Sequence, residues 1–124
     1  MIPKISDTEY KLLKGMILNF PVQLKTKEVS QLGIELERAE VVPDDQLEST
    51  IIRLNSGVEI RDEANQKLWN ITITLPEDAD TTQQKISVFS PLGVALIGFG
   101  EGHSVEWKLP GGLKKLKILS VSNK

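Results

Sequence analysis

Residues 86–98 read ISVFSPLGVALIG, and this stretch decides the fold. The pattern predicts a short strand over residues 86–88 that leads directly into a short helix. Ser90 can cap that helix with its hydroxyl, and Pro91 suits the first helical position, where an N–H group has no helical partner. Gly98 fits the position just after the helix, where the backbone turns left-handed. The helix face expected to be buried consists of Leu92, Ala95 and Leu96.

Runs of alternating apolar and polar residues surround this stretch and predict an antiparallel sheet. Turn residues separate the runs, notably at residues 55–57 (NSG) and 110–112 (PGG). A sheet with one short helix packed on it is an α+β domain, expected over residues 50–124. The predicted strands are residues 50–54, 58–61, 67–75, 86–88, 104–109 and 115–121.

Residues 1–43 have helical periodicity and predict a short antiparallel helical hairpin. Ser6 and Glu9 form a capping box, in which each side chain caps the backbone of the other residue. Pro21 ends the first helix, and the second begins near Thr26. Each helix is expected to be roughly 20 Å long. The two helices have apolar residues at alternating intervals of three and four, as in a coiled coil: Tyr10, Leu13, Ile17 and Phe20, then Val29, Leu32, Leu36 and Ala39.

Composition restricts the function classes further. The net charge of −2 provides no overall basic field that would attract nucleic acid. The chain has no cysteine, which excludes disulfides, thiolate zinc sites and cysteine nucleophiles. No apolar run reaches the length of a signal peptide or a membrane span, so we expect a cytoplasmic protein without a membrane partner. The polar, acidic residues 44–49 are expected to link the hairpin to the sheet.

No residue pattern indicates catalysis, so we predict no catalytic residue, no metal site, no cofactor and no enzyme activity. His103 is the only histidine, and its neighbour Ser104 would point to the opposite face of a strand, which argues against a hydrolytic triad. Residues 98–102 (GFGEG) follow a helix rather than a strand, so they lack the context of a nucleotide-binding glycine loop.

Three segments in this order and spacing resemble the C-terminal domain of the Gre transcript-cleavage factors. They are residues 55–58 (NSGV), 86–98 and 110–112. The resemblance covers residues 50–121 and implies a fold like that of the FK506-binding proteins. The short hairpin and residues 35–39 (ELERA) are similar to the regulators of nucleoside diphosphate kinase, a short-hairpin subfamily of the Gre superfamily.

The resemblance implies a transcription regulator that binds bacterial RNA polymerase. In the Gre family, the loop before the short helix docks on the rim of the polymerase's secondary channel, which here corresponds to Phe89, Ser90, Pro91 and Leu92. Some family members have an acidic residue where this chain has Phe89, so an apolar contact would replace a polar one. Contact with DNA or RNA is expected only inside the polymerase complex, and the oligomeric state stays open.

The hairpin lacks the paired acids with which Gre factors stimulate RNA cleavage. Those factors bring acidic side chains at the tip of a long coiled coil to a magnesium ion in the polymerase active site. Here the corresponding region offers only Glu28, near Lys25 and Lys27, on a hairpin too short to reach the catalytic centre. We therefore expect occupancy of the channel mouth without cleavage, in competition with Gre factors, with these three residues as tip contacts.

Two other functions stay open. The implied fold family includes peptidyl-prolyl isomerases, although aromatic residues make up only 5% of the chain, which argues against an aromatic-lined proline pocket. The other alternative is a general protein-interaction module whose partner is not the polymerase. Turnover of a prolyl peptide would favour the first alternative, and a lack of competition with Gre factors would favour the second.

Overall fold

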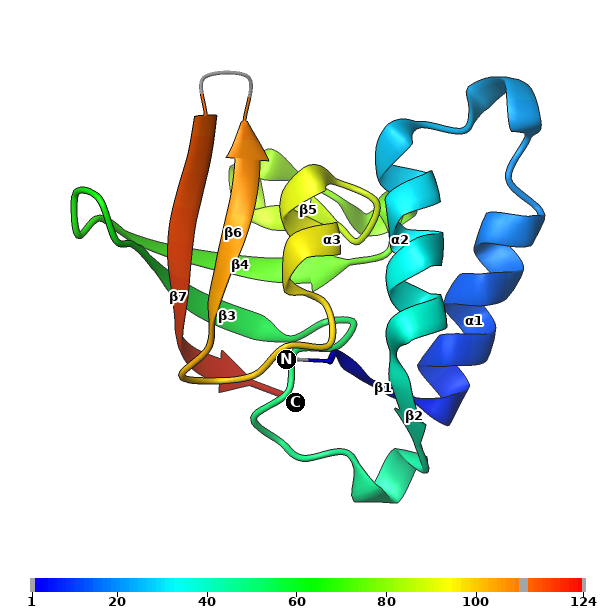
Figure 1. Ribbon diagram of the computed structural model, residues 1–124, viewed down its shortest axis with the longest axis horizontal. Coiled ribbons are helices and arrows are strands. Elements are labelled where there is room, and N and C mark those ends of the chain that lie inside the picture. Colours follow the sequence, from blue (N-terminus) through cyan, green and yellow to red (C-terminus); the bar gives the residue numbers. More distant parts are fainter. Residues whose placement is uncertain (1, 110–111, 124) are drawn as a thin grey trace.

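The computed structural model describes residues 2–109 and 112–123 and combines a helical hairpin with a curled five-stranded sheet (Figure 1). This arrangement confirms the predicted α+β class with its short N-terminal hairpin. Two residues of the turn predicted at 110–112, Pro110 and Gly111, lie outside the described residues. The strands of the sheet, in the spatial order β5-β4-β3-β7-β6, are β3 (Gly57–Asp62), β4 (Leu68–Thr74), β5 (Lys85–Ser87), β6 (Ser104–Leu109) and β7 (Gly112–Ser122).

The sheet is antiparallel except at one edge. β3 pairs antiparallel with β4 and β7, and β6 pairs antiparallel with β7. β5 instead runs parallel to β4, because the chain between them makes two turns of 3-10 helix, at Pro76–Asp78 and Thr81–Gln83, and returns in the same direction. In strand direction, the sheet therefore differs from the antiparallel prediction at this edge.

The strand predicted over residues 50–54 does not form. Ile51 makes only an isolated bridge with Gly100, although Ile51 and Ile52 are both buried. The N–H of Ile52 donates to the carbonyl of Phe99 at 2.8 Å, in the segment after the short helix. These two apolar residues are therefore buried against that segment without being part of the sheet.

The hairpin consists of α1 (Asp7–Leu18) and α2 (Lys27–Arg38). Both helix starts agree with the prediction. The Ser6 hydroxyl accepts from the N–H of Glu9 at 3.3 Å, and the Thr26 hydroxyl accepts from the N–H of Val29 at 3.2 Å. Two strands that the sequence analysis did not predict, β1 (Lys4–Ser6) and β2 (Glu40–Val42), pair in parallel at the base of the hairpin.

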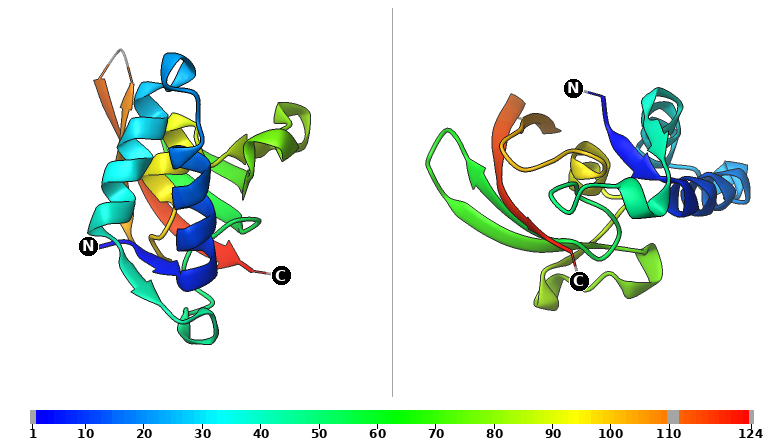
Figure 2. Two further views of the ribbon diagram at one scale, coloured as in Figure 1. Left: turned by 90° about the vertical axis from the view of Figure 1, so that its right-hand side faces the viewer. Right: turned by 90° about the horizontal axis from the view of Figure 1, so that it is seen from below.

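A single hydrophobic core joins the hairpin, the sheet and the short helix α3 (Pro91–Leu96). Figure 2 shows α3 between the curl of the sheet and the two hairpin helices. Since the same core includes residues from all three parts, it fixes how the hairpin sits against α3. The fully or almost fully buried members include Leu13, Leu32 and Leu36 from the hairpin, Ile60, Ile73, Leu116 and Ile118 from the sheet, and Val88 and Leu96 around α3.

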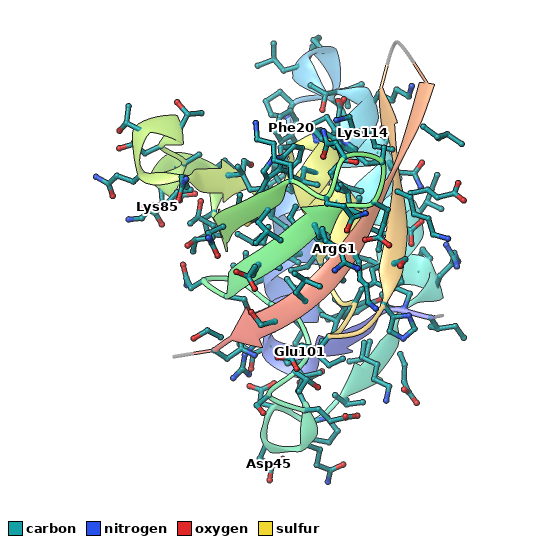
Figure 3. The ribbon with its side chains drawn as sticks, turned by 90° about the vertical axis from the view of Figure 1, so that its left-hand side faces the viewer. Phe20, Asp45, Arg61, Lys85, Glu101 and Lys114 are labelled. Atoms are coloured by element: carbon teal, nitrogen blue, oxygen red, sulfur yellow. The ribbon has the colours of Figure 1, made fainter. Side chains whose placement is uncertain are left out.

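Side-chain hydrogen bonds also attach the hairpin to the rest of the protein. One carboxylate oxygen of Glu9 accepts from the N–H of Leu54 at 3.2 Å, so Glu9 joins α1 to the start of the sheet domain and does not complete the predicted capping box. The acidic stretch 44–49 includes a turn of 3-10 helix (Asp44–Gln46). Its first residue, Asp44, accepts from the N–H of Thr8 at 3.0 Å. Figure 3 shows Asp45, in this turn, at the opposite end of the molecule from Phe20.

Glu9 gives a pH-dependent prediction. Burial raises the pKa of its carboxyl group above the ordinary 4.5, an effect that the Leu54 N–H and the charge of Arg53 partly offset. The folded protein therefore binds this proton more tightly than the unfolded chain does. The contribution to stability is complete below pH 4.5 and is lost as the pH rises through the higher pKa of the folded state.

We expect Glu9→Gln, which keeps the acceptor for Leu54 but has no charge, to be more stable than the parent protein at neutral pH. This gain should disappear in acid, and urea unfolding at a series of pH values measures it. Glu9→Ala is the matched control, because it leaves the Leu54 N–H without an acceptor and should cost about 1 kcal/mol. A gain in stability of Glu9→Gln that does not change with pH would contradict the raised pKa of the Glu9 carboxyl group.

None of the helices in the described part of the chain combines the length and the apolar character that crossing a bilayer requires.

Candidate functional site

The loop between β5 and α3 is held by its own serines. The Ser87 hydroxyl accepts from the N–H of Phe89 at 2.9 Å. The Ser90 hydroxyl donates to the carbonyl of Ser87 at 2.7 Å and accepts from the N–H of Gly93 at 3.0 Å, so it caps α3 as predicted. Pro91 follows at the first helical position and is exposed. This network gives the loop one defined shape.

Phe89 connects the loop to the hairpin. Its ring meets the ring of Phe20 edge-on, with centroids 6.0 Å apart and an angle of 79° between the planes. Phe20 lies just beyond the end of α1, so this aromatic pair joins the outer part of the hairpin to the start of α3. Both rings are half-buried, and Phe89 also packs against the hydrophobic core.

A groove of about 850 Å³ runs between α2, α3 and β6. Four consecutive residues of β6, Ser104–Trp107, line it. Since neighbouring side chains of a strand point to opposite faces, the groove follows the edge of this strand and not one face. β6 is the last strand of the sheet on this side. The other lining residues are Lys27, Glu28, Gln31, Glu35 and Arg38 from α2 and Pro91, Val94, Ala95 and Phe99 from α3 and the loop after it.

The groove has a charged wall and an apolar floor. On the α2 wall, Arg38 reaches both carboxylate oxygens of Glu35 at 3.1 Å. Trp107, which lines the β6 side, packs edge-on against Trp69 with centroids 5.9 Å apart. The indole N–H of Trp107 is buried and has no hydrogen-bond acceptor among the described residues. Such a surface is suited to holding a partner through apolar contact and a few directed polar contacts.

The structure brings together residues from both predicted contact sets. Lys27 and Glu28, predicted from the hairpin, line the same groove as Pro91, predicted from the loop. Lys25 is exposed on the helix connection, outside the groove. Leu92 has only 8% of its surface exposed and belongs to the core, so its side chain packs inside the protein. Ser90 is occupied in capping α3.

Sequence reasoning did not identify the rest of the groove. The signal on α2 was present as a polar stripe at intervals of three and four, formed by Glu28, Gln31, Glu35 and Arg38. Trp107 lies in a predicted strand and Phe99 in the segment after the predicted helix, and neither pattern shows that the two side chains line one groove, because this depends on how the sheet curls. Within the described residues, no group of three or more His, Cys, Asp or Glu side chains is placed to hold a metal ion.

A family comparison identifies the sheet domain. The family model described as "Transcription elongation factor, GreA/GreB, C-term" matches residues 47–123. The chain belongs to the GreA/GreB family. This finding confirms the resemblance described above and its extent along the chain.

Individual relatives agree with this assignment. The regulator of nucleoside diphosphate kinase of Escherichia coli K12 is 30% identical over 91 residues, which are 73% of this chain and 67% of that protein. GreA of Chloroflexus aurantiacus (strain J-10-fl) is 39% identical over 95 residues, which are 75% of this chain but only 59% of GreA. The chain therefore spans about three-fifths of the GreA relative.

Solved structures show that the likeness extends to the hairpin. A prokaryotic transcription elongation factor GreA/GreB from Nitrosomonas europaea superimposes with a TM-score of 0.81 at 31% identity, covering 99% of both chains. GreA factor homolog 1 of Thermus thermophilus, at 18% identity, has a TM-score of 0.53 and shares the fold. The hairpin and the sheet domain thus occur together, in a similar arrangement, in the first of these proteins.

Proposed function

We propose that this protein regulates transcription by binding bacterial RNA polymerase at the rim of the secondary channel. The observation that carries the proposal is the groove in which Lys27 and Glu28 of the hairpin and Pro91 of the Gre-type loop lie on one surface. A partner that docks on the loop would therefore meet α2 as well. The rigid loop geometry, with Ser90 capping α3, supports this role because it presents Pro91 without a loss of loop entropy on binding.

The hairpin supports occupancy of the channel without stimulation of RNA cleavage. Each helix has 12 residues, which corresponds to about 18 Å of helix. The connection, residues 19–26, contains no Asp or Glu. Holding a second magnesium ion requires carboxylate oxygens brought to the metal together. A protein with this hairpin would exclude longer Gre factors from the channel while supplying no metal ligands of its own.

Binding to purified RNA polymerase core, with and without a Gre factor as competitor, tests the proposal. We expect mutually exclusive binding and no stimulation of transcript cleavage. Pro91→Ala should weaken binding about tenfold, which corresponds to about 1.4 kcal/mol, because it removes an exposed apolar contact from the docking loop.

Pro76→Ala is the matched control for this variant. Pro76 also stands at the first position of a short helical turn, but it does not line the groove. The Pro76→Ala variant should therefore leave polymerase binding unchanged. Binding that a Gre factor does not displace would keep the polymerase as partner and remove the channel model, whereas no binding at all would overturn the proposal.

A prolyl isomerase remains the second candidate, favoured by one observation. Phe99 and Trp107 place two aromatic side chains in the apolar groove, although aromatic residues are scarce in the chain. An assay with a prolyl peptide discriminates the candidates, since turnover that Trp107→Ala abolishes would assign the groove to isomerisation.

A further inference from the structure

The outer edge of β6 has backbone groups that the sheet does not use. In the antiparallel ladder between β6 and β7, hydrogen-bonded pairs alternate with pairs that are not hydrogen-bonded. The N–H of Ile118 donates to the carbonyl of His103 at 2.8 Å, so every second residue after His103 continues this set of bonds toward β7. The N–H and carbonyl groups of Ser104 and Glu106 therefore point away from β7. No backbone group among the described residues bonds to them on that side, where β6 is the last strand.

These free backbone groups face the groove between α2, α3 and β6. Ser104 and Glu106 are exposed, and both line it. The four residues Ser104–Trp107 provide about 13 Å of strand edge, at about 3.3 Å per residue. An accessible row of N–H and C=O groups is a template on which another extended chain can continue the sheet. The backbone of an extended peptide is therefore the chemical group that fits this wall of the groove.

The floor of the groove suits alternate apolar side chains. Val94 and Ala95 of α3 line the floor. Val105 of β6 is only 8% exposed and belongs to the same core as α3, so the inner face of β6 is directed to this side. A strand added beside β6 would direct every second side chain to the floor and the others to solvent. The groove thus selects a segment in which apolar and polar residues alternate.

The helix α2 offers polar groups to the far edge of such a strand. Figure 2 shows α3 between β6 and α2, which form opposite walls of the groove. The side-chain amide of Gln31 donates to the carboxylate of Glu35 at 3.1 Å, and the guanidinium of Arg38 donates to the same carboxylate. Amide, carboxylate and guanidinium groups supply donors and acceptors for the backbone of an added strand. One strand in the groove would therefore find hydrogen-bonding groups on both of its edges.

The charges of the groove favour a basic segment. Its lining includes three carboxylates, Glu28, Glu35 and Glu106, but only two cations, Lys27 and Arg38. Within the described residues, Glu35 is paired with Arg38, and neither Glu28 nor Glu106 makes an ion pair. An excess of carboxylates repels the phosphates of a nucleic acid and attracts Lys or Arg side chains of a peptide.

We infer that this groove binds an extended peptide segment of a partner protein, which adds to β6 as a further strand. The segment has alternating apolar and polar residues and carries basic side chains. The inference goes beyond the proposed function, because it concerns the free edge of β6 and does not require the polymerase. A second copy of this chain does not fit as the occupant. Its sheet continues from β6 to β7, and its β7 would have to lie where α2 stands.

Amide hydrogen exchange of the full chain, followed by NMR, tests the inference. The probe is a capped peptide of alternating Val and Thr with a Lys at each end. At a concentration about ten times its Kd, the peptide should slow exchange of the Ser104 and Glu106 N–H groups about tenfold. The control peptide has a methyl group on every backbone nitrogen, so it keeps the side chains but donates no backbone hydrogen bonds. Its Kd should be at least about tenfold higher.

A variant of the β6 edge tests the same contact from the protein side. Glu106→Pro removes the outward N–H, and an edge strand tolerates proline at a position whose N–H is not in the ladder. The matched control is Glu106→Val, which loses the same charge but keeps the N–H. We expect the Kd of the probe to be about tenfold higher for Glu106→Pro than for Glu106→Val. Circular dichroism of both variants checks that they fold, and the methylated peptide tests the parent protein independently.

Three results would overturn the inference. The first is that the probe does not slow exchange at Ser104 and Glu106, and the second is that the methylated peptide binds as tightly as the probe. The third is slow exchange at these two residues without any peptide that becomes fast on dilution, because a second copy would then cover the edge. None of these results affects the proposed function, which polymerase binding and the Pro91→Ala variant test separately.

Discussion

Gly93→Ala is expected to reduce the free energy of unfolding by about 3 kcal/mol. A Cβ atom at this position would lie 2.3 Å from the carbonyl oxygen of Ser87 and 3.0 Å from the Cα of Val88. Both neighbours are backbone atoms, so the contact is relieved only by moving the loop away from α3. Urea unfolding followed by tryptophan fluorescence should show the loss as a lower midpoint.

The same substitution has a functional consequence. Moving the loop breaks the arrangement in which the Ser90 hydroxyl accepts from the N–H of Gly93, and it displaces Pro91. Polymerase binding should therefore weaken together with stability. The control is Gly15→Ala in α1, where a Cβ meets nothing within 4 Å and should stabilise the helix by about 0.5 kcal/mol. Unchanged stability of Gly93→Ala would mean that the loop adapts freely and is not a fixed docking surface.

Gly98→Ala has the second large expected effect, a loss of about 3 kcal/mol that combines two causes. Gly98 has a φ of +86°, a conformation that side chains with a Cβ rarely adopt. A Cβ there would also lie 2.7 Å from the Cβ of Pro3 and 3.0 Å from Cδ1 of Ile5. Its carbonyl accepts from the N–H of Lys4 at 2.9 Å, so this glycine joins the end of α3 to β1 at the base of the hairpin.

Gly102→Ala separates these two causes. Gly102 has the same φ of +86°, but a Cβ at this position meets nothing within 4 Å. It should lose only about 1 kcal/mol, the cost of the left-handed backbone. The difference between the two variants, measured by urea unfolding under the same conditions, reports the packing of β1 against the end of α3. Equal losses would show that β1 moves aside without cost and that the base of the hairpin is loosely attached.

The local features of this protein could be predicted from the sequence because their causes lie within a few residues. The serine caps at Ser6 and Ser90 and the glycine after α3 act through groups no more than four positions away. The intervals of three and four in the hairpin identified its buried face, since Leu13, Leu32 and Leu36 are all in the core.

The sequence analysis did not predict the pairings and contacts that join distant segments of the chain. β1 and β2 have three residues each, too few for an alternating pattern, and each forms only by pairing with the other. The parallel pairing of β5 depends on the path of the preceding connection. Ile51 and Ile52 are buried like strand residues, yet the segment after α3 covers them and no strand forms.

The candidate site also combines features set by the local sequence with features set by the tertiary structure. The sequence by itself determined the shape of the loop between β5 and α3, the family to which the chain belongs and the absence of acids from residues 19–26, because these are local chemistry or local pattern. Only the tertiary structure decided that Lys27, Glu28 and Pro91 share one groove with Trp107, and that Leu92 is buried. Such contacts join residues far apart in the chain, and they arise from the common core that sets the hairpin against α3 and the edge of β6.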